Sequence, residues 1–131
     1  MSDGPAVRRA RTVAVIEDDP DIRWLLEEFA QDAGFDVQMY ATYDEALMRL
    51  AAQPVNAIIA DCIDCGYIRP TESDRARIAE LASHAPTILH TARPWANDTT
   101  IAATLDVNSV VPKPTDFSVL LAALEHAMLQ R

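Results

Sequence analysis

The sequence predicts an α/β fold of the doubly wound class, in which a five-stranded parallel sheet is covered by five helices. Short apolar runs alternate five times with longer amphipathic stretches along the 131 residues. The runs are continuously apolar rather than alternating, which is typical of strands buried on both faces of a parallel sheet. Polar side chains follow several of these runs, and in such sheets ligands bind at the carboxyl ends of the strands.

The first strand is expected over Val13–Ile16, where the sequence reads V-A-V-I. The first helix is expected to begin at Asp19-Pro20, because Asp is a favoured N-cap and Pro suits the first helical position. Gly34 is expected to end this helix. One helical face carries the apolar residues Ile22, Leu25, Leu26 and Phe29.

The middle of the chain predicts two more strands with a helix between them. The strands are Val37–Tyr40 and Ala57–Ala60. The helix is expected to open with the capping box Thr42-x-x-Glu45. Its apolar side holds Ala46, Leu47 and Leu50.

The last two strands are expected at Thr87–Leu89 and Ser109–Val111. The third helix spans about residues 72–83 and buries Ile78 and Leu81, whereas β-branched residues lower the helix propensity of the fourth, near residues 99–105. The fifth covers about residues 116–129. Its apolar stripe consists of Phe117, Leu120, Leu121, Leu124 and Met128.

We expect one domain over residues 12–131, preceded by a flexible tail over residues 1–11 that holds the one basic cluster. The net charge of -9 argues against a nucleic-acid partner, since phosphate neutralisation requires basic patches. No stretch reaches the roughly 18 apolar residues of a membrane span. Without a secretory signal or a disulfide framework, a cytoplasmic protein is expected.

Chemically active side chains follow four of the strands. Glu17-Asp18-Asp19 follows the first, Asp61 the third, Thr91 the fourth and Lys113 the fifth. Clustered carboxylates repel one another, so we expect Asp18, Asp19 and Asp61 to hold a hard cation, Mg²⁺ or Mn²⁺. Asp61 could then attack phosphorus, with Lys113 neutralising charge and Thr91 donating its hydroxyl. Asp19 is also expected to cap the first helix.

The sequence resembles the receiver domain of bacterial two-component response regulators, of the stand-alone type. Four motifs carry the resemblance, which extends from Thr12 to the end of the chain: V-I-E-D-D-P at residues 15–20, A-I-I-A-D at 57–61, T-I-L-H-T-A at 87–92 and V-V-P-K-P at 110–114. The resemblance implies a flavodoxin-like fold and a phosphoacceptor at Asp61. It further implies metal binding by Asp18 and Asp19, a switch hydroxyl on Thr91, phosphate pairing by Lys113 and a cis Lys113–Pro114 bond.

The resemblance also implies a signalling protein rather than an enzyme. A histidine kinase or phosphotransfer protein would phosphorylate Asp61, and the signal would pass to an unknown downstream protein without an attached output domain. Trp24 lies opposite the core stripe of its helix, so Trp24, with Arg23, is expected to contact the kinase or phosphotransfer protein; the alternative is a ring lying flat on its own helix. Trp95 is a second candidate contact or a core residue.

Two departures keep other functions open. The loop after Asp61 reads Cys-Ile-Asp-Cys-Gly66 where the family has a Met-Pro pair, and Val110 replaces an aromatic switch residue. A receiver-like module that binds partners without phosphorylation is therefore one alternative. A metal-dependent phosphohydrolase with an Asp nucleophile is another, which Ile63 disfavours because such enzymes carry a second acid there.

The spacing Cys62-x-x-Cys65 suits redox pairs and metal sites. The favoured interpretation is nevertheless that both cysteines are small residues filling the loop. His90 lies inside a strand and is expected to pack in the core.

Overall fold

A computed structural model describes residues 11–129 of the chain. These residues form one parallel sheet with the strand order β2-β1-β3-β4-β5. The strands are β1 (Thr12–Ile16), β2 (Asp36–Tyr40), β3 (Ala57–Ala60), β4 (Thr87–Thr91) and β5 (Ser109–Pro112). The order changes direction after β1, so the carboxyl ends of β1 and β3 border the position where such sheets bind ligands. The predicted fold class is confirmed.

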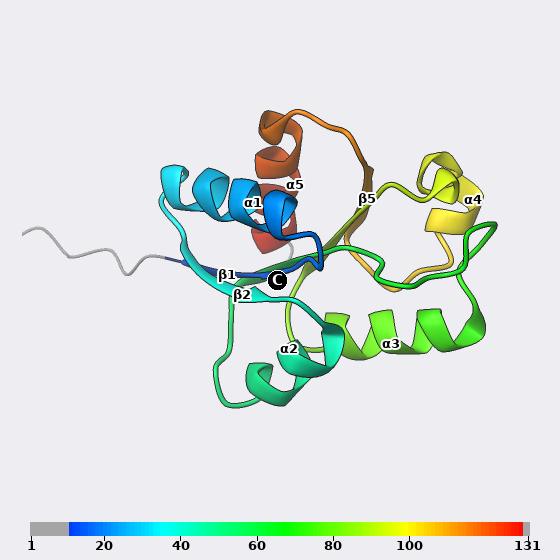
Figure 1. The fold of residues 1–131 in the computed structure, drawn as a ribbon, viewed down its shortest axis with the longest axis horizontal. Coiled ribbons are helices and arrows are strands. Elements are labelled where there is room, and N and C mark those ends of the chain that lie inside the picture. The colour runs from blue at the N-terminus through cyan, green and yellow to red at the C-terminus, as the bar shows by residue number, and fades with distance from the viewer. Residues whose placement is uncertain (1–10, 130–131) are drawn as a thin grey trace, which may run out of the picture.

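Helices cover both faces of the sheet (Figure 1). The α-helices are α1 (Pro20–Asp32), α2 (Tyr43–Leu50), α3 (Glu72–Ala82), α4 (Thr99–Ala102) and α5 (Phe117–Leu129), and a 3₁₀ turn, η1 (Pro94–Asn97), precedes α4. Helices α1 and α5 lie on one face, and α2 and α3 lie on the other (Figure 1). Within residues 11–129 no helix is long and apolar enough to cross a membrane.

Each face of the sheet carries its own apolar core. Val13 and Val15 of β1 pack with residues of α1 and α5, including Leu26 and Leu124. Their neighbours Ala14 and Ile16 point to the opposite face, because successive strand residues alternate in direction. There they pack with residues of α2 and α3, among them Ala46, Leu50, Ile78 and Leu81. Burial on both faces explains the continuous apolar runs of the strands.

Two predicted details are wrong. Leu25 is 44 % exposed, and Ala30 is buried in its place. The core stripe of α1 follows the i, i+4 pair Leu26 and Ala30, which leaves Leu25 at the edge of the stripe. The fourth helix is a single turn, Thr99–Ala102, instead of about residues 99–105, in line with the poor helix propensity of its β-branched residues.

The predicted tail of residues 1–11 lies outside the described residues except for Arg11. The Arg11 carbonyl accepts a hydrogen bond of 2.9 Å from the Asp36 N–H, and its guanidinium lies 5.2 Å from the centre of the Phe35 ring. Arg11 therefore belongs to the folded domain rather than to a free tail.

His90 is a core residue, as predicted, and is 5 % exposed. Neither ring nitrogen has a hydrogen-bond partner among the described residues. Burial, together with the positive charge of Lys113, lowers the pKa of His90 to about 4. The folded protein therefore keeps this imidazole neutral at a pH where an exposed histidine would take up a proton.

His90 should make the fold sensitive to acid. Between pH 6.5 and 4 the unfolded chain binds the proton at this position and the folded chain does not, so the stabilisation present above pH 6.5 is lost as the pH falls. We expect His90→Leu to remove a pH-dependent change of about 2 kcal/mol in the free energy of unfolding, measured with urea from pH 7 to 4. His84→Leu keeps His90 and should keep the wild-type pH dependence; an unchanged dependence in His90→Leu would contradict the prediction.

Candidate functional site

A cavity of about 240 Å³ opens at the carboxyl end of the sheet. Segments that follow β1, β3, β4 and β5 line it, as the strand-end rule predicts. The lining residues are Asp18, Asp61, Cys62, Ile63, Asp64, Thr91, Ala92, Arg93 and Lys113. Asp61, Thr91 and Lys113, which the sequence placed at three different strand ends, therefore share one cavity.

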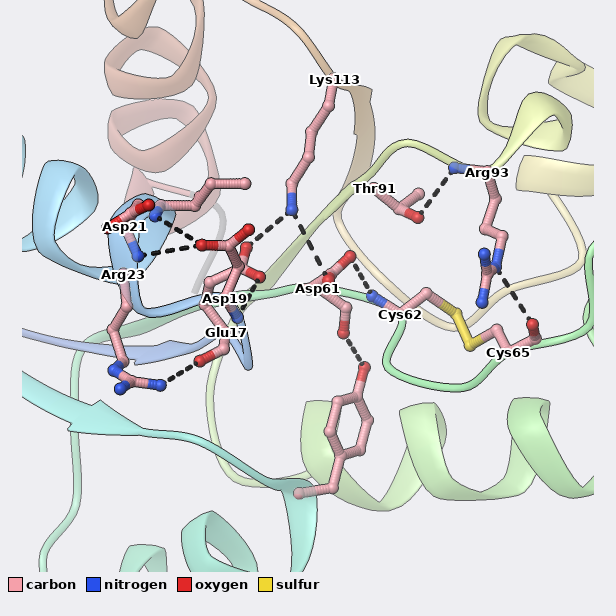
Figure 2. Close-up of polar contacts among 12 residues, drawn as sticks. Glu17, Asp19, Asp21, Arg23, Asp61, Cys62, Cys65, Thr91, Arg93 and Lys113 are labelled. Atoms are coloured by element: carbon pink, nitrogen blue, oxygen red, sulfur yellow. Dashed lines mark hydrogen bonds and ion pairs between the residues drawn. A yellow bond between two sulfur atoms is a disulfide. The ribbon is translucent and has the colours of Figure 1, made fainter.

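Asp61 is held from three directions at the end of β3 (Figure 2). Its N–H donates to the Ile16 carbonyl at 2.8 Å, and its own carbonyl accepts a 2.6 Å hydrogen bond from the Tyr43 hydroxyl. The Cys62 N–H donates to Asp61 Oδ1 at 2.8 Å. Asp61 Oδ2 remains, and it lies 3.6 Å from Lys113 Nζ. One carboxylate oxygen is thus oriented by the backbone while the other faces a cation.

Three acidic side chains converge beside this carboxylate. Glu17, Asp18 and Asp61 each offer an oxygen, and these oxygens lie within 4.8 Å of one another. Burial raises the pKa of Glu17; its hydrogen bond with Lys113 opposes this effect, and the negative charge of Asp61 adds to it. Hard divalent cations are bound by such sets of oxygen ligands, and a cation would relieve the repulsion among the three acids. The residues present therefore fit Mg²⁺.

Asp19, predicted as a metal ligand, does not join this cluster. Its Oδ1 accepts hydrogen bonds from the backbone N–H groups of Asp21 and Ile22, at 2.9 and 3.3 Å, so it is the N-cap of α1. A side chain turned toward the helix cannot also point into the cavity, and Glu17 takes the third position instead. Pro20 was the available signal, because a proline at the first helical position marks the preceding Asp as the cap.

Lys113 and Thr91 complete the cavity. Lys113 Nζ lies 2.7 Å from Glu17 Oε1, and this pair joins the ends of β5 and β1 (Figure 2). The Lys113 N–H donates to the Thr91 carbonyl at 2.9 Å, while Thr91 Oγ1 accepts from the Arg93 N–H at 3.2 Å. The Lys113–Pro114 bond is cis, as expected.

The loop after Asp61 differs from its predicted character. Cys62 and Cys65 are buried, in keeping with a loop-filling role, but they are also joined by a disulfide (Figure 2). Arg93 Nε donates to the Cys65 carbonyl at 3.1 Å, and Trp95 Nε1 donates to the Gly66 carbonyl at 2.9 Å. The segment after Thr91 is therefore bonded to the segment after Asp61. The Cys-x-x-Cys spacing was the available signal for the disulfide, whereas the contacts of Arg93 and Trp95 have no local motif.

The two tryptophans have opposite environments. Trp95 is 3 % exposed and therefore belongs to the core, which excludes it as a surface contact. Trp24 is 59 % exposed on α1, next to the exposed Leu25. The guanidinium of Arg23, the residue before Trp24, donates to the Glu17 carbonyl at 2.9 Å. Arg23 therefore holds the acidic segment that follows β1.

The family model described as response regulator receiver domain matches residues 13–125. A search of the curated proteins found no match. Among solved structures, a sensor protein from Polaromonas sp. JS666 is 23 % identical, with a TM-score of 0.73 over 92 % of this chain and 97 % of that chain. The receiver domain of sensor histidine kinase PA1611 from Pseudomonas aeruginosa PAO1, solved with a magnesium ion in its active-site cleft, is 21 % identical, with a TM-score of 0.72 over 92 % and 98 %. Response regulator protein TrrA from Thermotoga maritima, in complex with Mg²⁺-BeF, is 23 % identical, with a TM-score of 0.69 over 89 % and 98 %.

Alanine substitutions should distinguish Asp19, the N-cap of α1, from Asp18, a member of the acidic cluster. Asp19→Ala should lower the free energy of unfolding by about 1 kcal/mol, because the N–H groups of Asp21 and Ile22 lose their acceptor. Asp18→Ala should lower it by less than about 0.5 kcal/mol, since this exposed side chain caps nothing and its removal reduces repulsion among the acids. Urea denaturation in the presence of a metal chelator measures both values; a larger loss for Asp18→Ala than for Asp19→Ala would reverse the assignment.

Proposed function

Because the chain belongs to the family of response regulator receiver domains, we propose that it receives a phosphoryl group on Asp61 from a histidine kinase or a histidine phosphotransfer protein. The observation that carries this proposal is the position of Asp61 Oδ2. This oxygen faces the cavity, 3.6 Å from Lys113 Nζ and beside the carboxylates of Glu17 and Asp18.

The proposed step is a transfer to a carboxylate nucleophile. An Asp61 oxygen attacks phosphorus, the bond between phosphorus and the donor's imidazole nitrogen breaks, and that nitrogen keeps the electron pair. The Cys62 N–H fixes the orientation of the carboxylate before the attack. Lys113 balances the charge of the incoming phosphoryl oxygens, at the cost of sharing its charge with Glu17.

Glu17, Asp18 and Asp61 are the proposed ligands of Mg²⁺. When bound, the ion would neutralise the acidic cluster and the phosphoryl oxygens, which is the main requirement of phosphoryl transfer. Asp19 is not among these ligands, because its side chain caps α1. Mn²⁺ has no observation in its favour over Mg²⁺.

Thr91 is the proposed group that responds to phosphorylation. Its side chain is buried and lines the cavity, where its hydroxyl could donate to a phosphoryl oxygen. The same Oγ1 accepts the Arg93 N–H, so a movement of Thr91 would alter the segment that leads to η1. Phosphorylation would in this way shift a conformational equilibrium that a downstream protein reads.

The exposed end of α1 is the proposed docking position for the phosphoryl donor. Trp24 and Leu25 present apolar surface there, and a shallow hollow is lined by these two residues and Asp21. Aromatic side chains of this kind dominate the binding energy of protein interfaces. Arg23 is less suited to a direct contact, because its guanidinium is bonded to the Glu17 carbonyl.

Phosphorylation of Asp61 can be tested with acetyl phosphate and Mg²⁺, followed by intact mass measurement. We expect one phosphoryl adduct on the wild type, none on Asp61→Asn, and none when a chelator removes Mg²⁺. Asp18→Asn should lose most of the labelling because it removes a ligand, whereas Asp19→Asn should keep it. The absence of an adduct, together with a failure of beryllofluoride to bind, would favour a module that signals without phosphorylation; sustained phosphate release would favour the phosphohydrolase.

Docking can be tested with Trp24→Ala and a phosphorylated donor identified by phosphotransfer profiling. Loss of an interface tryptophan should lower the second-order rate of transfer about thirtyfold, the equivalent of about 2 kcal/mol. Met48→Ala is the matched control, since Met48 is an exposed apolar residue on α2 and should transfer at the wild-type rate. Equal rates for wild type and Trp24→Ala would remove α1 as the docking position. Labelling of the same variant by acetyl phosphate checks that its site is folded.

A further inference from the structure

The disulfide shapes the first turn after the phosphoacceptor. The Cys65 N–H donates to the Cys62 carbonyl at 3.4 Å, and the two Cα atoms are 5.4 Å apart. Asp64, the third residue of this turn, adopts a left-handed conformation with φ of 59°. Both the Cα separation and the closed turn suit a disulfide bond. The cross-link therefore fixes the path of the chain immediately beyond Asp61.

One end of this cross-linked turn contacts the acceptor carboxylate. Cys62 supplies both a sulfur atom to the disulfide and the N–H that donates to Asp61 Oδ1 at 2.8 Å. This N–H belongs to the first residue of the cross-linked turn, so the disulfide restrains the position of the residue that carries it. The disulfide and the orientation of the acceptor are thus linked through one residue (Figure 2).

The other end of the turn contacts the segment that follows β4. The Cys65 carbonyl accepts from Arg93 Nε, and the adjacent Gly66 carbonyl accepts from Trp95 Nε1. Arg93 is also the residue whose N–H donates to Thr91 Oγ1. The disulfide turn therefore bridges the phosphoacceptor and the threonine segment, which are the two parts of the site that the proposed function requires to act together.

Each cysteine borders a cavity. Both cysteines are largely buried, at 2 % and 7 % exposure. Cys62 nevertheless lines the cavity that contains Asp61, and Cys65 lines a neighbouring cavity of about 260 Å³ between α2 and α3. Tyr43 of α2, together with Asp74 and Ile78 of α3, also lines this second cavity.

We propose that Cys62 and Cys65 form a reversible redox site whose substrates are dithiols, and that the disulfide form is the one competent for rapid phosphorylation. A thiolate of the dithiol attacks one sulfur of the pair and forms a mixed disulfide; its second thiol then displaces the other cysteine. Two electrons and two protons pass to the protein, which ends with two thiols, and the dithiol ends as a disulfide. The redox chemistry stands by itself, while its effect on Asp61 rests on the proposed function.

Reduction should slow phosphorylation because it releases the turn. Without the cross-link the four residues of the turn regain conformations in which the Cys62 N–H no longer points at Asp61 Oδ1. Loss of one hydrogen bond to a charged group corresponds to a change of about threefold or more in rate. Phosphorylation would then report two inputs, the phosphoryl donor and the thiol–disulfide balance of the surroundings.

The redox state is tested by alkylation and intact mass, after equilibration in mixtures of reduced and oxidised dithiothreitol. The wild type should take up no alkyl groups in the oxidised mixture and two in the reduced one, and reoxidation should restore the unlabelled state. Cys62→Ser and Cys65→Ser should each take up one group in both mixtures. Two alkyl groups on the native wild type in every mixture, including the oxidised one, would overturn the proposal.

The effect on the acceptor is tested by the rate of labelling from acetyl phosphate and Mg²⁺. The oxidised wild type should react at least about threefold faster than the reduced wild type. Both serine variants should react at the rate of the reduced wild type, with or without reductant. Equal behaviour of the two variants would show that the missing cross-link, and not one particular cysteine, slows the reaction. Equal rates for the oxidised and reduced wild type would overturn the coupling.

A third measurement distinguishes failure of this inference from failure of the proposed function. If Asp61 accepts no phosphoryl group in either state, the proposed function fails, and the redox coupling is judged by tryptophan emission. Reduction should change the emission of the wild type, through the Trp95 contact with Gly66, and the change should be absent from Trp95→Phe and from the serine variants. An emission that is the same in both redox states would show that the turn does not communicate with the segment after Thr91.

Discussion

The ion pair between Lys113 and Glu17 is the interaction on which the site depends. It joins residues 96 positions apart in sequence, at 2.7 Å, and ties the end of β5 to the end of β1 across the ends of β3 and β4. Glu17 is almost fully buried, and an unpaired buried carboxylate would be strongly destabilising. Lys113 makes that burial possible, and at 3.6 Å from Asp61 Oδ2 it also prepares the cavity for negative charge.

The cavity is left with an excess of acid that the lysine cannot balance. Glu17, Asp18 and Asp61 gather beside one ammonium group, so this cluster favours a further cation. A site that is electrostatically incomplete by itself can respond to what enters it. The packed sheet holds the strand ends at fixed separations, whereas the segments that follow the strands around the cavity are the parts that can move.

Two of these segments are bonded to each other rather than only to the sheet. Arg93 and Trp95 reach from the segment after β4 to the carbonyls of Cys65 and Gly66 after β3. A change at Asp61 therefore has a short path to the region of η1 and α4. Val110 stands on β5 where the resemblance implies an aromatic residue, and it borders a hollow with residues of α4.

Patterns in the sequence were sufficient to predict the sheet, the order of its elements and the meeting of Asp61, Thr91 and Lys113. Apolar runs, helix caps and the rule that parallel strands end at one edge are local or topological properties, and a linear chain displays them. The tertiary structure alone decided which of the neighbouring acids joins the cluster, since Asp19 could serve the helix or the cavity and only the direction of its side chain settles the choice. It likewise decided the burial of Trp95, because the contact of Trp95 with Gly66 joins segments that are far apart in the sequence. It also decided the bonding of the two cysteines, because the Cys-x-x-Cys spacing by itself is compatible with a redox pair, a metal site or loop packing.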